Sequence, residues 1–226
     1  MSIFQRIFGP KKPKTAILTI HGFGTNLHHH YDYLSKYFEA FNIPVIQFDI
    51  YDVDNPNDDK LQDWISRCET QMLQTRKEYE EIILIGFSMG GVIASYLASI
   101  YKVKQLILVA PAFQYLDLGK VGSALYSWAT KDASDFKPSV SQTSCFQQVV
   151  SNYKECISQV DCPVLFLHGS EDEVISVESS RNAYKKVSGK KLLLVIEGAS
   201  HKMLYNNTVQ DTLFEIIHSS IKGKLF

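Results

Sequence analysis

Six short apolar runs recur along the chain, and segments with a helical spacing of apolar residues separate most of them. Each run is nearly continuous in Ile, Leu and Val, which is typical of strands buried on both faces of a sheet. The runs cover residues 15–20, 44–50, 81–86, 105–110, 163–168 and 191–196. The pattern therefore predicts about six buried strands.

The segments between the runs carry helical patterns. Residues 90–101 are rich in Ala, Ser and Ile, as in a helix packed closely on a sheet, and residues 204–221 carry an apolar stripe. A third stripe, at helical spacing, consists of Leu61, Trp64, Ile65, Cys68, Met72 and Leu73. Strands that alternate with helices form right-handed crossovers. We therefore expect a single α/β domain over residues 1–226, with a doubly wound, mainly parallel sheet and helices on both faces.

The interval 112–161 interrupts this alternation, because it contains no convincing strand. It carries two helical patterns, the second of them around Cys145. An insertion after the carboxyl end of a strand lies where α/β proteins bind ligands. We therefore expect a small helical cap over the site, with Tyr115, Tyr126 and Trp128 as substrate-binding side chains. The alternative is that the interval only covers an edge of the sheet.

The strongest local motif is Gly-Phe-Ser-Met-Gly at residues 86–90, between the strand 81–86 and the helix 90–101. This G-x-S-x-G pattern is typical of a nucleophile on a sharp strand-to-helix turn. Glycines two positions before and after the serine leave room for that turn, and the helix N-terminus favours a developing oxyanion. Ser88 is therefore the candidate nucleophile.

A serine hydroxyl needs a general base, and the chain has seven histidines. His21 and His168 each end a strand in a His-Gly pair, where an imidazole commonly satisfies backbone groups. Residues 28–30 are consecutive histidines at an expected solvated helix start, and His218 lies late in the last helix, at the expected surface. His201 follows the last strand in a loop of small residues that can carry its ring toward the nucleophile. We therefore expect His201 to be the base.

The base in turn needs a carboxylate that fixes its tautomer. The loop after the strand 163–168 contains three acidic residues, Glu171, Asp172 and Glu173. We expect Asp172 to be the acid, with the two glutamates as competitors. The alternative is that these carboxylates cap the helix that begins near Val177.

The first strand is followed by His-Gly-Phe-Gly at residues 21–24. Two glycines let this backbone approach a substrate closely. We expect the backbone N–H groups of Phe23 and Met89 to form an oxyanion hole, and Phe23 to contact the substrate as well. Loss of one such donor typically costs about 3–4 kcal/mol of transition-state stabilisation. The alternative is a plain strand-to-helix turn.

Charge and composition exclude several classes of function. Lys plus Arg number 23 against 24 for Asp plus Glu, and a net charge of −1 argues against a protein that binds nucleic acid through a positive field. No run approaches the roughly 20 apolar residues of a membrane span, and the four cysteines lack metal-site or disulfide spacings. The acidic run 52–59 departs from a calcium loop at Pro56 and Asn57, and is expected to be a solvated loop that caps the next helix. We therefore expect a cytoplasmic protein with no metal, no cofactor and no stable membrane insertion.

Four motifs together resemble the α/β-hydrolase superfamily. They are His21-Gly22-Phe23-Gly24, Gly86-Phe87-Ser88-Met89-Gly90, His168-Gly169-Ser170-Glu171-Asp172 and Ser200-His201. The chain looks closest to small bacterial carboxylesterases and monoacylglycerol-lipase-like enzymes, although the usual leading antiparallel strands are absent or very short. The resemblance implies Ser88 as nucleophile, Asp172 as acid and His201 as base, with the Phe23 and Met89 amides as oxyanion donors. It implies cleavage of carboxylic esters through an acyl-enzyme, and the aromatic residues of the expected cap favour short to medium acyl chains.

Other functions stay open at this point. The same three residues serve thioesterases, amidases, peptidases and C–C bond hydrolases. A hydrolase-fold binding protein without catalysis is a remote alternative, because such proteins usually lose at least one catalytic element. Dehalogenase chemistry is disfavoured, since it needs an aspartate where Ser88 stands. Apolar and basic residues within 3–14 leave a peripheral membrane role as a further alternative.

Overall fold

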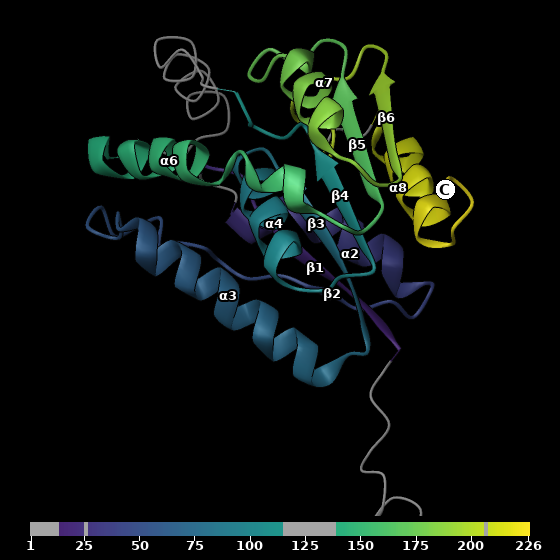
Figure 1. Cartoon of the computed structure of the whole chain (residues 1–226), viewed down its shortest axis with the longest axis horizontal. Helices are drawn as coiled ribbons and strands as arrows, with labels where there is room; N and C mark the ends of the chain where they lie inside the picture. Colours follow the sequence, from purple (N-terminus) through teal and green to yellow (C-terminus); the bar gives the residue numbers. More distant parts are fainter. Residues whose placement is uncertain (1–13, 25–26, 115–138, 206–207) are drawn as a thin grey trace, which may run out of the picture.

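The chain forms a parallel β-sheet with helices on both faces (Figure 1). Its computed structural model describes residues 14–24, 27–114, 139–205 and 208–226. Across these residues six strands pair in the order β2-β1-β3-β4-β5-β6, and every pair is parallel. In chain order the elements are β1 (Thr15–Ile20), η1 (Leu27–Tyr31), α2 (Asp32–Glu39), β2 (Val45–Ile46), α3 (Leu61–Glu78), β3 (Glu81–Phe87), α4 (Met89–Ile100), β4 (Gln105–Val109), α6 (Val140–Tyr153), η2 (Cys156–Gln159), β5 (Val164–Gly169), α7 (Val177–Lys186), β6 (Lys191–Ile196) and α8 (Gln210–Ile221). The predicted doubly wound α/β architecture is confirmed.

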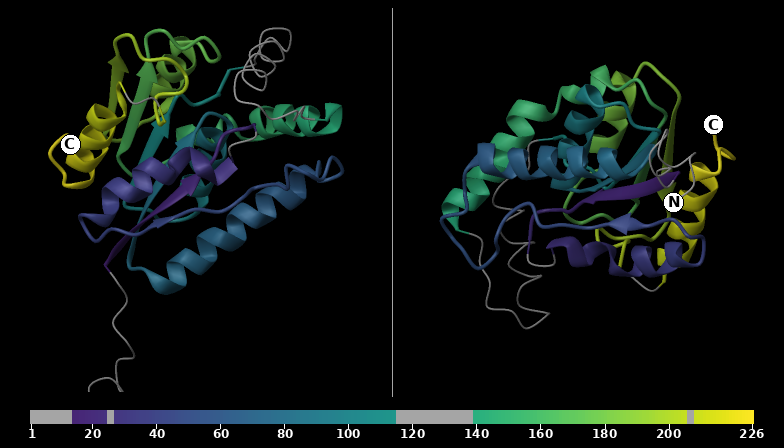
Figure 2. Two further views of the ribbon diagram at one scale, coloured as in Figure 1. Left: turned by 180° about the vertical axis from the view of Figure 1, so that it is seen from behind. Right: turned by 90° about the horizontal axis from the view of Figure 1, so that it is seen from below.

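Helices cover both faces of the sheet (Figure 2), and a layer of apolar side chains lies between the sheet and the helices on each face. Successive side chains of a strand point to opposite faces, so Leu84 of β3 packs in the layer of α3, α4, α6 and α7, whereas Ile83 packs in the layer of α2 and α8. Both faces of β3 and β4 are therefore covered, and their residues are almost all buried. This double coverage explains why the central strands are continuous apolar runs in the sequence.

The two edge strands differ from the prediction. The run 44–50 forms a strand only at Val45–Ile46, because the chain then bends and the Ile50 amide donates to the His21 ring (2.8 Å) instead of to a neighbouring strand. At the other edge, β6 is only partly buried. The prediction of full burial on both faces is therefore wrong for these two runs, since the residues of β2 and all but one of β6 are only partly buried.

The helices follow the predicted stripes with two differences. Leu73 of α3 was expected in the buried stripe but is 45% exposed. The last helix begins at Gln210 rather than near residue 204, because residues 201–205 form turns. The second helix predicted in the interval 112–161 is α6, whereas Tyr115, Tyr126 and Trp128 lie outside the described residues, as do residues 1–13. No helix in the described ranges is long and apolar enough to cross a membrane.

The order of the strands places the candidate site. The chain runs from β1 outward to β2, returns to β3 on the other side of β1, and then continues through β4, β5 and β6. Ligand sites of such sheets lie at the carboxyl ends of the strands, next to this reversal. The segment 21–24 follows β1 and Ser88 follows β3, and the loops after β5 and β6 end at the same edge.

Candidate active site

Ser88 occupies a strained turn between β3 and α4. Its backbone angles are φ 52° and ψ −119°, which residues other than glycine rarely adopt. Glycines surround the turn for a steric reason. A Cβ at Gly86 would lie 2.5 Å from the carbonyl oxygen of Gly90, and a Cβ at Gly90 would lie 2.0 Å from that of Ile20. The local geometry is therefore that expected of a nucleophile on a strand-to-helix turn.

Backbone hydrogen bonds hold Ser88 in this conformation. Its N–H donates to the carbonyl of Val109 (3.0 Å), and its carbonyl accepts from the amides of Gly91 (3.0 Å) and Ala112 (3.1 Å). Unfavourable angles of this kind cost about 1–3 kcal/mol and persist only where the surrounding structure fixes them. The bonds to α4 and to the end of β4 provide that constraint.

Asp172 and His201 form a buried hydrogen-bonded pair. His201 Nδ1 lies 2.8 Å from Asp172 Oδ2, and the two side chains are 1% and 0% exposed. Because a carboxylate only accepts, His201 donates its Nδ1–H, which leaves Nε2 as the nitrogen that can take up a proton. The His201 ring also packs against Phe87, the residue before Ser88, with ring centroids 4.8 Å apart. The pair thus lies beside the turn of the candidate nucleophile.

The loop around Asp172 holds its carboxylate in place. Oδ1 accepts from the amides of Val174 (2.9 Å) and Ile175 (2.8 Å). Burial alone would raise the pKa of Asp172, but hydrogen bonds from His168, from His201 and from the Ile175 amide outweigh it and hold that pKa well below its usual range. The carboxylate therefore stays ionised throughout the neutral pH range.

The neighbouring carboxylates have other surroundings. Glu171 is exposed, and Glu173 accepts from the backbone amide of His201 (3.2 Å) rather than from its ring. The N-cap of α7 is Ser176, whose hydroxyl accepts a backbone N–H of the first helical turn. The alternative that Asp172 caps this helix is therefore wrong, and Asp172 is the carboxylate on the imidazole.

Backbone contacts join the loops after β5 and β6. The amide of Ser170 donates to the carbonyl of Ile196 (2.9 Å), and that of Glu171 donates to the carbonyl of Ala199 (3.0 Å). A Cβ at Gly169 would lie 2.0 Å from the Ala199 oxygen, so this approach requires glycine. The candidate acid and base are therefore carried by one closely packed pair of loops.

The loop after β1 lies directly against the candidate nucleophile. A Cβ at Gly22 would lie 3.2 Å from Ser88 Cβ and 2.9 Å from the Phe87 ring. Tyr51 holds the far end of this loop, because its hydroxyl accepts from the Gly24 N–H and donates to the Gly24 carbonyl, both at 2.8 Å. Nothing in the sequence around Tyr51 indicates this role, since its partner is a backbone group 27 residues away.

His21 fixes the peptide group between Gly22 and Phe23. Its Nδ1–H donates to the Gly22 carbonyl (2.7 Å), while Nε2 accepts from the Ile50 amide (2.8 Å). A peptide group is planar, so a fixed Gly22 carbonyl also fixes the direction of the Phe23 N–H, one of the two expected oxyanion donors. Burial lowers the pKa of His21 to about 4, so the ring stays neutral near pH 7. The other expected donor, the Met89 N–H, is at the first residue of α4.

The three consecutive histidines do not share one environment. His28 pairs with Asp49 and His29 with Asp32, both near the surface. His30 is only 4% exposed, and its Nδ1–H donates to a backbone carbonyl. Its ring packs on Phe87 (5.0 Å between centroids), and burial lowers its pKa to about 3. The expected solvated position is therefore wrong for His30, because η1 directs this side chain inward, against the rings of Phe87 and Tyr205.

His218 also departs from its expected surface position. Its ring packs 3.9 Å from that of Phe41 and 5.7 Å from that of Phe38, measured between centroids. Burial lowers its pKa, and within the described part of the chain its Nε2 has no hydrogen-bond partner. His218 is thus an aromatic packing residue between α8 and α2.

An aromatic cluster borders the loop after β1. The Phe23 ring stacks on Phe146 of α6 (5.3 Å) and lies 5.7 Å from Tyr51, which in turn stacks on Trp64 (4.5 Å). All four side chains are nearly fully buried. Phe146 belongs to the interval 112–161, so the described part of that interval reaches the expected oxyanion loop. No motif marks Phe146, because its contact depends on how α6 packs.

The acidic run 52–59 does not cap α3. The N-cap residue is Lys60, which lies outside the run, and its side chain makes no capping hydrogen bond. Instead Asp58 is 7% exposed, forms an ion pair with Arg67 (2.8 Å) and accepts from the Asp52 amide (2.8 Å). The loop is solvated as predicted at residues 52 and 54–57, but the predicted cap is wrong, and the buried carboxylate of Asp58 is paired instead, as burial of a charge requires. No cluster of three or more His, Cys, Asp or Glu within the described ranges could hold a metal ion.

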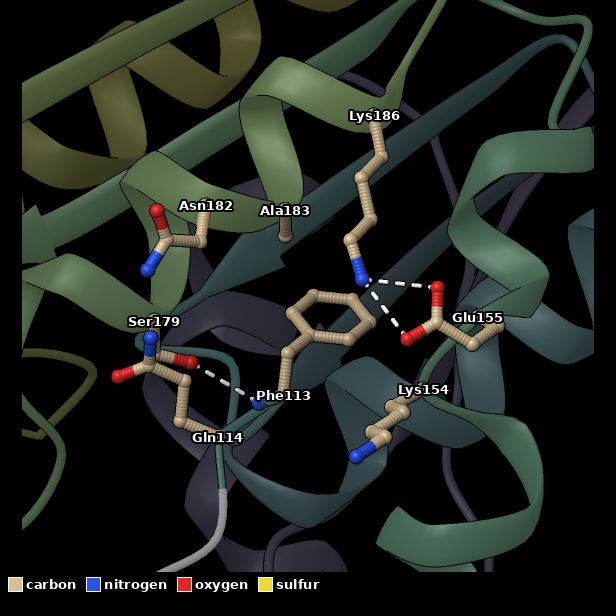
Figure 3. A pocket seen from close by; sticks show the side chains of 8 residues that line it. All are labelled: Phe113, Gln114, Lys154, Glu155, Ser179, Asn182, Ala183 and Lys186. Carbon is tan, nitrogen blue, oxygen red and sulfur yellow. Dashed lines mark hydrogen bonds and ion pairs between the residues drawn. The ribbon is translucent and has the colours of Figure 1, made fainter.

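A separate pocket of about 200 Å³ lies beside α7 (Figure 3). Lys186 and Glu155 form an ion pair across it (2.8 Å), and the Phe113 amide donates to the Ser179 hydroxyl (2.9 Å). Its described lining residues include none of the candidate nucleophile, acid and base. The contact between Phe113 and Ser179 anchors the beginning of the interval 112–161 on α7.

Solved structures of other proteins share this fold. One from the metagenome-derived lipolytic enzymes LipS and LipT superposes with a TM-score of 0.77 at 18% identity, covering 94% of this chain and 95% of that one. A monoglyceride lipase from Saccharomyces cerevisiae superposes with a TM-score of 0.72 at 18% identity, covering 96% of this chain and 89% of that one. The chain therefore has the α/β-hydrolase fold.

Proteins of similar sequence include some that are named as α/β hydrolases or esterases. The α/β hydrolase domain-containing protein 17C of Mus musculus is 34% identical over 133 residues, which cover 58% of this chain and 36% of that protein. The match thus spans only about a third of the length of the 17C proteins. The putative esterase/lipase 2 of Mycoplasma pneumoniae is 24% identical over 242 residues, covering 89% of this chain and 88% of that protein.

A family model matches almost the whole chain. The match extends over residues 16–218 and so includes Ser88, Asp172 and His201. It belongs to a family described as the uncharacterised protein family UPF0227. On the strength of this match the chain belongs to the UPF0227 family, here with the α/β-hydrolase fold.

Proposed function

We propose that this protein is a serine hydrolase that cleaves carboxylic esters through an acyl-enzyme. The observation that carries the proposal is the buried 2.8 Å hydrogen bond from His201 to Asp172 beside the strained turn of Ser88. The names of its relatives give further support, since they include a putative esterase/lipase, lipolytic enzymes and a monoglyceride lipase. Ser88 is then the nucleophile, His201 the base and Asp172 the acid.

The proposed reaction has two halves. His201 Nε2 takes the Ser88 hydroxyl proton while Oγ attacks the ester carbonyl carbon, and the Phe23 and Met89 N–H groups stabilise the oxyanion. The bond to the alcohol oxygen then breaks, and the alcohol leaves with the proton from His201. In the second half, His201 takes a proton from water, the water oxygen attacks the acyl carbon, and Ser88 regains the proton as the acid leaves. Asp172 keeps the His201 tautomer and stabilises its charged form.

The proposed substrates carry short to medium acyl chains. The stacked rings of Phe23 and Phe146 give the oxyanion loop an apolar border, which favours an acyl chain over a charged group. Tyr115, Tyr126 and Trp128 are proposed as further contacts from the cap. Esters with short to medium acyl chains should therefore be better substrates than esters with either a very small acyl group or a long acyl chain.

Labelling with a fluorophosphonate tests the proposal directly. Such a probe phosphonylates only an activated serine, so one equivalent should attach, and peptide mapping should locate it at Ser88. The labelled protein should lose its activity on a panel of nitrophenyl esters of increasing acyl length. Label on another serine, or none on the folded protein, contradicts the proposal. Turnover of thioesters or amides in preference to esters would instead correct the substrate class.

Asp172→Asn should lower kcat for ester hydrolysis by about 10⁴-fold with little change in KM. Asparagine offers an N–H to the imidazole, so His201 adopts the wrong tautomer while the shape of the site is kept. Steady-state kinetics on the best nitrophenyl ester give both constants. Glu171→Gln is the matched control, because it neutralises an exposed carboxylate of the same loop and should leave both constants unchanged. Similar losses in the two variants would remove Asp172 from the role of acid.

A further inference from the structure

His168 is a second imidazole on the carboxylate of Asp172. Its Nε2 lies 3.2 Å from Asp172 Oδ2, the oxygen that also lies 2.8 Å from His201 Nδ1. The same Nε2 lies 2.9 Å from the Ile175 carbonyl oxygen, and Nδ1 lies 2.7 Å from the Ser180 hydroxyl. The His168 side chain has no solvent exposure, and the polar groups that contact its ring within the described residues are these three: the Asp172 carboxylate, the Ile175 carbonyl and the Ser180 hydroxyl.

The neighbours of His168 determine which ring nitrogen carries a proton. The carboxylate of Asp172 and the carbonyl of Ile175 are both acceptors, so a bare Nε2 would direct its lone pair at two other lone pairs. Nε2 therefore carries a proton that the two acceptors share. The Ser180 hydroxyl can donate to Nδ1, which completes the hydrogen bonding of the ring.

We propose that His168 is a positioning residue, whose Nε2–H group fixes the direction of the Asp172 carboxylate toward His201. The proposal rests on the function proposed above. Without His168, Oδ1 would keep its two backbone amides, but Oδ2 would have His201 as its one described donor. With His168, the carboxylate has donors on both oxygens from its own loop and strand, and its plane is set independently of the base.

This placement matters because the base must keep its orientation through two proton transfers. When His201 becomes charged and neutral again, its bond to Oδ2 strengthens and weakens. A carboxylate held by His201 alone could rotate with each change, whereas one held by His168 as well keeps its position. Displacements of about 1 Å in such groups can cost about 10²-fold in rate.

The contact with Ile175 suits a second, purely structural role, in which His168 only closes the loop 169–175. The distance from Nε2 to the Ile175 oxygen is shorter than the distance from Nε2 to Asp172 Oδ2 (2.9 against 3.2 Å). A loop-closing residue would affect folding stability and substrate binding. A positioning residue affects kcat specifically, and its effect depends on a donor at the place of Nε2.

The first test is a direct measurement of the tautomer and needs no turnover. NMR spectra of protein labelled with ¹⁵N-histidine report the protonation of each ring nitrogen, and His168→Gln assigns the His168 signals. We expect a proton on Nε2 of His168 and on Nδ1 of His201 near neutral pH. A bare Nε2 on His168 would overturn the proposal, whether or not the protein is active.

The second test compares two replacements of similar size. His168→Gln keeps an N–H donor near the place of Nε2, whereas His168→Leu removes it. We expect His168→Leu to lower kcat by about 10- to 100-fold with KM nearly unchanged, as loss of an outer hydrogen-bond partner does at other sites. We expect His168→Gln to recover most of that loss.

Gln105→Leu is the matched control for the general effect of removing a buried hydrogen bond. Gln105 is 4% exposed, donates to Ser220 and begins β4, at the opposite end of the strands from the site. The Gln105→Leu variant should therefore have a lower melting temperature but an unchanged kcat. Equal kcat values for His168→Leu and the unaltered protein, or equal losses in the Leu and Gln variants, would overturn the positioning role. An unaltered protein that neither hydrolyses esters nor reacts with fluorophosphonate overturns the proposed function itself, which is a separate outcome.

Discussion

Replacing Ser88 with alanine is expected to lower kcat/KM for ester hydrolysis by about 10⁴- to 10⁶-fold. Alanine has no oxygen to attack the carbonyl carbon, so the acyl-enzyme cannot form and only water-mediated hydrolysis in the oxyanion site is left. Folding should change little, because the backbone bonds to Val109, Gly91 and Ala112 that hold the turn do not involve the hydroxyl. Kinetics on the best nitrophenyl ester, together with thermal unfolding, measure both effects.

Ser95→Ala provides the matched control for this experiment. Ser95 lies on the same helix, α4, is fully buried, and donates its hydroxyl to the Gly91 carbonyl (2.8 Å). Its replacement removes a hydroxyl of the same kind without touching the site, so activity should persist. Residual activity of Ser88→Ala equal to that of Ser95→Ala would show that the hydrolysis does not use Ser88.

The free energy of unfolding is expected to fall steeply as the pH is lowered below about 6.5. Burial lowers the pKa of His21 to about 4 and that of His30 to about 3, whereas both rings titrate normally in the unfolded chain. Between pH 6.5 and 4 these two rings therefore make the unfolded chain bind up to two more protons than the folded one, and the lowered pKa of His218 acts in the same direction. Stability rises with pH in this window and is lost on acidification, by about 3 kcal/mol per pH unit for two protons. Urea unfolding at a series of pH values gives the slope.

A histidine variant shows whether these rings cause the slope. His30→Gln keeps a side-chain N–H and removes one titrating group, so the slope should fall by up to about half, and His21 and His218 account for what is left. His29→Gln serves as the control, because the His29 side chain is 65% exposed. An unchanged slope in His30→Gln would mean that other groups govern the acid unfolding.

The central part of the fold could be predicted because both faces of the sheet are covered. Buried strands such as β3 must be apolar throughout, and the turn at Ser88 needs glycines at two fixed positions, so both are visible in the sequence. The loops after β5 and β6 were also predictable in position, since parallel strands bring their carboxyl ends to one edge. Because the loop after β5 reaches that edge, Asp172, one of its three acidic residues, could be proposed as the carboxylate of the site.

Other features depend on packing that no local pattern encodes. The run 44–50 has the composition of a strand, but the His21 ring takes the Ile50 amide and ends the pairing after Ile46. His30 is polar and sits among other histidines, yet η1 turns it inward. The contact of Phe146 with Phe23 joins residues 123 positions apart in the chain, counting from 23 to 146. Tertiary contacts of this kind decide burial where the local sequence is neutral.

The division of the site along the chain has a consequence for biosynthesis. The proposed nucleophile and oxyanion donors precede residue 90, whereas the proposed acid and base lie in the loops after β5 and β6. The two groups are united by the pairing of β4 with β5, which begins at Leu106 and Val164. A nascent chain that has folded β1 to β4 therefore holds a serine without its base. Hydrolytic capacity would arise late, in one step, when the last two strands join the sheet.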